Sequence, residues 1–184
     1  MNLWERIEKK MRPKDINARQ EKRLEILFFL VRLSILAVPL YLLMSIPGIL
    51  APLQSATTGM VEFILTSMGF EVARQGNLLS VPGFSFIIDE DCTGWKSVMF
   101  LFALVFSVKG REAKSRLLGF IAGSAAIVAF NLVRITGSVL AQAAWGTELA
   151  LFLHDWVFRY ALVMLVVGIW GIWLYLSRKT KNKS

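Results

Sequence analysis

Long apolar runs alternate with short polar segments along this chain of 184 residues. A helix of about 20 apolar residues crosses the ~30 Å hydrocarbon core of a bilayer, and four runs approach or exceed that length. We expect these runs to be transmembrane helices, at residues 26–50, 93–109, 117–140 and 156–177. Pro39 and Pro47 fall within the first run, where a membrane helix tolerates proline with a gentle kink.

The segment between the first two runs, residues 51–91, is too polar to cross a membrane. Within it, residues 59–70 are amphipathic and too short to span, which predicts an interfacial or re-entrant helix. Residues 71–80 and 81–88 place turn residues between β-formers and predict a small hairpin that leads to Cys92. The predicted fold is an all-α polytopic membrane protein with about four transmembrane helices, an interfacial helix and a small extracytoplasmic hairpin.

Composition supports a membrane protein and excludes several other classes. The chain is 55% hydrophobic and 18% charged, with a mean hydropathy of +0.56, which is more apolar than one soluble core of this size requires. Its net charge of +8 comes from short basic runs between apolar segments, so we expect no nucleic-acid partner. One cysteine and one histidine allow no internal disulfide and no zinc cluster, so we expect no metal or other cofactor.

Basic residues gather in three segments that a four-span chain places on one side of the membrane. Of the 21 Lys and Arg residues, eight lie in residues 1–25, four in residues 109–116 and four in residues 178–184. The positive-inside rule predicts that this side, with both termini, is cytoplasmic. We expect a basic interfacial arm at 1–25 whose first helix breaks at Pro13, a membrane-embedded catalytic domain at 26–177 and a basic tail at 178–184, in a multi-pass protein of the cell membrane.

Four residues of chemical interest fall at one depth near the outer face in this topology. Arg134 lies 17 residues after Leu117, which at 1.5 Å per residue is roughly 26 Å up a ~30 Å core. Cys92 lies at the outer mouth of the second run, His154 just before the fourth run, and Arg159 about one turn inside it. Their convergence from distant parts of the chain predicts a functional site on the outer side.

These residue types fit acyl transfer. A cysteine thiolate is a nucleophile, a histidine moves protons near neutral pH, and an arginine stabilises an oxyanion in a water-poor site. If a helix begins at Thr93, Cys92 is its N-cap and the helix dipole favours the thiolate. The acidic run at residues 89–91 opposes ionisation of the thiol. We therefore expect a cation, His154 or Arg134, to decide whether Cys92 is a thiol or a thiolate.

At these positions the chain resembles the exosortase/archaeosortase family of membrane transpeptidase-like cysteine enzymes. The matching pieces are residues 65–72, Val81-Pro82-Gly83, Cys92-Thr93-Gly94, Asn131-Leu132-Val133-Arg134 and His154. The resemblance implies that Cys92 is the nucleophile, Arg134 an oxyanion or positioning group and His154 the acid/base. Because some archaeal members use Arg where others use His, Arg159 remains a rival for the third role or a substrate-binding group.

The resemblance also implies a substrate. Family members process exported surface proteins that end in a short recognition motif, a transmembrane helix and a basic tail, and archaeal systems join the product to a lipid. The chain has about four spans, fewer than the longer exosortases, and so resembles a small, archaeosortase-like member. We expect hydrolysis or transfer through a Cys92 thioester, with Asn131 and Asp91 in supporting roles.

Plainer interpretations remain open beside these. A lone membrane cysteine is often a packing residue, Arg134 could anchor at the interface, and Arg159 could pair with Asp155 four residues earlier. The main alternative function is a non-enzymatic membrane subunit or small transporter, although a transporter would place polar groups near the midplane. A thiol oxidoreductase needs a second cysteine, and an aspartyl peptidase would need paired carboxylates such as Asp89 and Asp91 set into a span.

Overall fold

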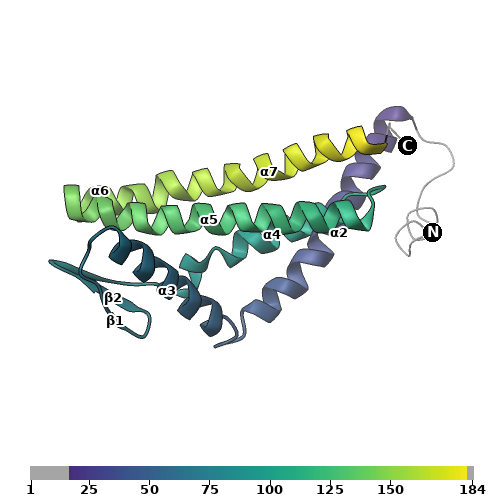
Figure 1. Ribbon diagram of the computed structural model, residues 1–184. Coiled ribbons are helices and arrows are strands. Elements are labelled where there is room, and N and C mark those ends of the chain that lie inside the picture. The colour runs from purple at the N-terminus through teal and green to yellow at the C-terminus, as the bar shows by residue number, and fades with distance from the viewer. Residues whose placement is uncertain (1–16, 182–184) are drawn as a thin grey trace.

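The computed structural model describes residues 17–181 and shows a bundle of long helices with smaller elements gathered at one end (Figure 1). The predicted break at Pro13 lies outside the described residues. By length and composition, three helices among the described residues could cross a membrane, at Ala18–Leu43, Ala113–Trp145 and Thr147–Ser177, and Trp95–Ser107 is a shorter apolar helix. A polytopic α-helical membrane protein is therefore confirmed, with a count of four spans only approximate.

The first long helix, α2 (Ala18–Met44), carries Pro39 in its interior. It ends six residues before residue 50, so the predicted C-terminal boundary of the first span was wrong. Pro47 cannot continue the hydrogen-bonded ladder, and Gly48 adopts a left-handed φ of 80°, so the chain turns there. The next helix, α3 (Ala51–Ser67), starts directly after this turn and is longer than the predicted interfacial helix at residues 59–70.

The predicted hairpin is present and has a third strand. Strands β1 (Ala73–Gln75), β2 (Leu78–Val81) and β3 (Phe84–Ile87) form an antiparallel sheet in sequence order. Gln75 pairs with Leu78 and Val81 pairs with Phe84, so each connection is a two-residue turn that contains a positive-φ glycine. The sheet packs its fully buried Leu79 against α3 and the C-terminal half of α5, which positions the segment that leads to Cys92.

The second predicted span, residues 93–109, is a shorter helix than expected. A 3₁₀ turn, η1 (Glu90–Thr93), comes first, and α4 (Trp95–Ser107) follows after Gly94. With 13 residues, α4 is only about 20 Å long, which is less than the thickness of a hydrocarbon core. Leu101, Ala103 and Val105 are nonetheless fully buried, because α4 packs between α2, α5 and α7.

Two long antiparallel segments form the body of the bundle (Figure 1). They are α5 (Ala113–Trp145), followed by α6 (Thr147–Phe152), the π-helical turn η2 (Leu153–Val157) and α7 (Phe158–Lys181). Both segments extend beyond the predicted spans at 117–140 and 156–177. A Cβ at Gly119 would lie 2.3 Å from Trp173, and one at Gly123 would lie 2.6 Å from Leu101. The small residues of α5 therefore permit close helix packing, as the sequence predicts.

The bundle has two chemically different ends (Figure 1). At one end, the loop between α4 and α5 meets the end of α7, where Arg111 donates to the Ser177 carbonyl at 2.8 Å. At the other end lie α3, the sheet, η1, α6 and η2. Residues Val61, Leu65, Leu79, Ile88, Ile135 and Val139 form a buried apolar cluster there, and Cys92 packs against it. This end of the bundle contains the candidate site.

Candidate active site

Cys92 is held by hydrogen bonds on both sides of its backbone. Its amide donates to the Asp89 carboxylate at 3.1 Å, and its carbonyl accepts from the Asn131 side chain of α5 at 2.6 Å. Asn131 is 2% exposed, so this bond lies away from water, where an unpaired carbonyl would be costly. Asn131 thus fixes η1 against α5.

The residues that flank η1 have local reasons for their identity. Gly94 has a φ of 78°, and a Cβ there would lie 3.2 Å from the Asn131 side chain, so glycine allows both the turn and the close approach. Upstream, the Gln54 side chain of α3 donates to the Ile88 carbonyl at 2.7 Å, and Ile88 in turn donates to the Asn77 carbonyl at 3.0 Å. Cys92 therefore sits on a loop that is anchored at both ends.

The electrostatics of Cys92 differ from the sequence expectation. Burial raises the pKa of the Cys92 thiol, the Asp89 carboxylate raises this pKa further, and the Arg134 guanidinium acts in the opposite direction. The predicted N-cap position was wrong, because Gly94 separates η1 from α4 and Cys92 lies inside its own 3₁₀ turn. Burial and the Asp89 carboxylate therefore both favour the protonated thiol over the thiolate.

Arg134 and His154 form a hydrogen-bonded pair. Arg134 follows Asn131 by about one turn of α5 and is 7% exposed, whereas His154 comes from the π-helical turn η2. The Arg134 Nη2 atom lies 2.9 Å from His154 Nε2. Ser138, four residues after Arg134, places its Oγ 3.2 Å from His154 Nδ1. The histidine ring is thus held at both nitrogens by α5.

The hydrogen bonds determine which ring nitrogen of His154 carries the proton. The Ser138 hydroxyl donates its single proton to the Arg134 carbonyl at 2.8 Å, so its oxygen can only accept from the ring. His154 Nδ1 must therefore be the N–H donor. Nε2 then holds a lone pair, which accepts from the Arg134 guanidinium. The arrangement describes a neutral imidazole whose basic nitrogen is engaged by Arg134.

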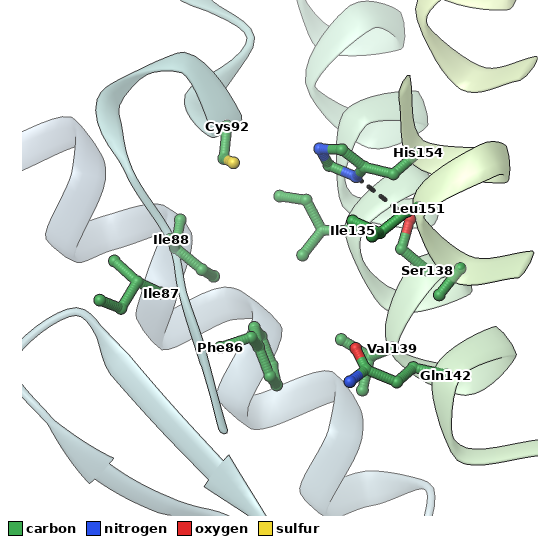
Figure 2. A pocket seen from close by; sticks show the side chains of 11 residues that line it. Phe86, Ile87, Ile88, Cys92, Ile135, Ser138, Val139, Gln142, Leu151 and His154 are labelled. Atoms are coloured by element: carbon green, nitrogen blue, oxygen red, sulfur yellow. Dashed lines mark hydrogen bonds between the residues drawn. The ribbon is translucent and has the colours of Figure 1, made fainter. Parts of the chain in front are cut away.

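A cavity of about 220 Å³ separates Cys92 from His154. In Figure 2 the Cys92 sulfur and the His154 ring point toward one another across this space. Apolar side chains from β3, α5 and α6 form most of its wall, and the polar lining is Cys92, Ser138, Gln142 and His154. The cavity is therefore bordered by a thiol and an imidazole, and the buried Arg134 guanidinium contacts the same imidazole.

Two of the predicted site residues lie elsewhere. Arg159 is 69% exposed, and its Nη2 lies 4.0 Å from an oxygen of Asp155, which is the i, i+4 pair that the plainer interpretation anticipated. Asp91 is bound to Lys96 at 2.6 Å, and both side chains are more than half exposed. Asp89 contacts Cys92 in place of Asp91.

Sequence reasoning missed Ser138 as a partner of His154. The signal was present, because Ser138 follows Arg134 by four residues and so shares its helix face. Among the described residues, no three His, Cys, Asp or Glu side chains come together as a metal cluster.

Comparison with known proteins identifies the family. A family model described as transmembrane exosortase matches residues 18–176, which covers every helix and strand described above except the last five residues of α7. No curated protein and no solved structure gives a significant match to the chain. Exosortases are membrane sorting transpeptidases of the cysteine type, and this agrees with a polytopic helical chain that carries one cysteine. The chain therefore belongs to the transmembrane exosortase family.

Proposed function

We propose that this protein cleaves the C-terminal sorting signals of membrane-anchored, exported proteins through a thioester on Cys92. The observation that carries the proposal is the cavity in which Cys92 faces His154, while Arg134 binds the same histidine. These three side chains come from η1, α5 and η2; Cys92 and His154 line the cavity, and Arg134 contacts His154. Nucleophile, proton acceptor and oxyanion donor are the parts that acyl transfer requires.

The hydrogen-bond pattern supports a sequence of steps. The substrate carbonyl attracts the Arg134 guanidinium, which releases Nε2 of His154 to take the proton of the Cys92 thiol. The sulfur then bonds to the carbonyl carbon, and Arg134 stabilises the resulting oxyanion. The carbon–nitrogen bond breaks as the leaving amine takes the proton from His154, which leaves a Cys92 thioester. Water or a lipid nucleophile attacks the thioester and restores the thiol.

The positions of charge along the bundle support an orientation. The site lies at the opposite end from the loop between α4 and α5 and from the end of α7, where basic residues gather. By the positive-inside rule those basic segments are cytoplasmic, so the site faces outward and both termini face the cytoplasm. A precursor with a recognition motif, a transmembrane helix and a basic tail matches this polarity, because its tail stays inside while its motif reaches Cys92.

Processing assays with single substitutions test the proposal. Conversion of such a precursor should be lost in Cys92→Ala and should persist in Asp91→Asn, because Asp91 only pairs with the exposed Lys96. Full processing by Cys92→Ala would reject the cysteine mechanism. Loss in Asp91→Asn with survival in Cys92→Ala would instead favour an aspartyl peptidase. No processing by the wild-type protein of any such precursor would favour a non-enzymatic subunit.

A further inference from the structure

The cavity beside Cys92 is larger and more apolar than proton transfer requires. Its volume of about 220 Å³ equals the space of roughly seven water molecules at ~30 Å³ each. In Figure 2 Cys92, His154 and Ser138 lie along one part of the cavity, and Phe86, Val139 and Gln142 lie together further from the sulfur. The space thus extends beyond the reacting groups, which indicates that it accommodates a part of the substrate.

We propose that this cavity is the binding subsite for one large apolar side chain, on the substrate residue whose carbonyl Cys92 attacks. The inference rests on the proposed function and adds a preference in the substrate. In the thioester that residue remains bonded to the Cys92 sulfur, so its side chain necessarily lies next to Cys92. Since Cys92 is itself part of the cavity lining, the cavity is the space nearest to that side chain.

The lining determines which side chains bind well. Among the described residues that line the cavity there is no Lys, Arg, Asp or Glu, and the wall includes Phe86, Ile87, Ile135, Val139, Ala150 and Leu151. A charged side chain would lose its hydration there without gaining a charged partner. Leucine, methionine or phenylalanine would instead bury apolar surface, which favours binding by about 1.5–3 kcal/mol, or roughly 10- to 150-fold. Glycine would leave the cavity unfilled.

A series of electrophiles tests this preference without a known substrate. N-acetyl-aminoacyl chloromethyl ketones with Gly, Leu, Phe, Asp or Lys side chains alkylate a thiolate, which displaces chloride and forms a carbon–sulfur bond. Chloromethyl ketones also alkylate histidine, and His154 lines the cavity, so peptide mapping by mass spectrometry with Cys92→Ala as the blank assigns the label to Cys92, the only cysteine of the chain. After normalisation to the rate with glutathione, the Leu and Phe reagents should label the detergent-solubilised protein at least ~10-fold faster than the Gly, Asp and Lys reagents.

Two cavity variants and a matched control locate the effect. Val139→Phe fills the cavity and should lower the ratio of Leu to Gly labelling by roughly tenfold, with the Gly rate retained. Val133→Phe makes the same change on the same helix at a side chain that is 60% exposed, and it should leave the ratio unchanged. Leu151→Ala removes apolar wall at a half-exposed position and should also lower the ratio, so it decides the matter if Val139→Phe does not fold.

The outcomes separate this inference from the proposed function. Equal normalised rates for Gly and Leu in the wild-type protein would overturn the inference, as would a ratio that a folded Val139→Phe or Leu151→Ala variant leaves unchanged. Processing that requires Cys92 would still support the proposed function in either case. Conversely, a strong Leu preference combined with full processing by Cys92→Ala would show an apolar pocket beside Cys92, but it would reject the cysteine mechanism and with it the assignment of the pocket to the acylated residue.

Discussion

At the scale of single residues, the proton on His154 is the most specific consequence of the structure. Ser138 uses its only proton on the Arg134 carbonyl, so His154 must donate from Nδ1 and accept at Nε2. The topology predicted from sequence placed Arg134 and His154 at one depth. It could not predict their contact, because the π-helical turn that aims His154 has no recognisable pattern in its residues.

The tautomer is directly measurable, because His154 is the only histidine of the chain. With ¹⁵N-labelled histidine, the NMR spectrum of the substrate-free protein should show a protonated Nδ1 and an unprotonated Nε2. Ser138→Ala removes the acceptor for Nδ1–H, but Arg134 can only donate to Nε2, so Nδ1 should remain the protonated nitrogen in this variant. A spectrum of the wild-type protein with the proton on Nε2 would contradict the hydrogen-bond assignment.

The charge of Asp89 should control the reactivity of Cys92. Burial raises the pKa of the thiol and the Asp89 carboxylate raises it further, so the thiolate appears only as the pH rises through this elevated pKa. Asp89→Asn keeps an oxygen that can accept from the Cys92 amide but removes the charge. The midpoint of the rate of alkylation by iodoacetamide against pH should therefore move to lower pH.

The matched control for this titration is Asp91→Asn, two residues away. Asp91 pairs with the exposed Lys96, whereas Asp89 contacts Cys92. The midpoint of alkylation against pH in Asp91→Asn should therefore stay close to that of the wild-type protein. A midpoint that moves to higher pH in Asp89→Asn would show that the carboxylate stabilises the thiolate, contrary to the geometry.

At the scale of elements, the anchoring of η1 decides where Cys92 lies. The sequence predicted a helix starting at Thr93, yet Gly94 in a left-handed conformation ends the 3₁₀ turn and starts α4 separately. A glycine at the end of a turn is a known stop signal, so this boundary could have been read from the sequence. The hydrogen bond from Asn131 to the Cys92 carbonyl could not have been read from the sequence, because the packing of α4 on α5 brings the two residues together.

Gly94→Ala should destabilise this region. The change places a Cβ on a residue with a φ of 78° and brings it within 3.2 Å of Asn131, a strain of about 1–2 kcal/mol before the contact is counted. The midpoint of thermal unfolding in detergent should fall for Gly94→Ala relative to the wild-type protein. Gly168→Ala is a suitable control, because that position on α7 has no neighbour within 4 Å of the added Cβ. Equal midpoints for the two variants would contradict the anchoring role.

At the scale of the whole molecule, the apolar runs and the basic segments predicted most of the arrangement. The long helices follow from the apolar runs, whereas the hairpin within the small sheet was predicted from the turn residues between β-formers in residues 71–88. The span count was less accurate, because α4 is too short to cross a hydrocarbon core alone and owes its buried position to the helices around it. Hydropathy reports only the composition of a segment, so it cannot show that the burial of α4 depends on the helices packed around it.

The orientation of the bundle in the membrane is testable with the single cysteine. If the positive-inside rule holds, a membrane-impermeant maleimide added to intact cells should label Cys92 from outside at elevated pH, where the thiolate forms. A variant with Cys92→Ala and a new cysteine at Ser184 should resist the same reagent until the cells are opened. Labelling of the terminal cysteine in intact cells would reverse the topology.

If the proposed mechanism operates, Cys92 becomes acylated during turnover. A precursor that ends in a recognition motif, a transmembrane helix and a basic tail should be incubated with the solubilised protein, quenched in acid and analysed by mass spectrometry. We expect an adduct with the mass of the acyl fragment, mapped to Cys92, released by hydroxylamine and absent from Cys92→Ala. An adduct on any other residue, or processing by Cys92→Ala at the wild-type rate, would contradict the account.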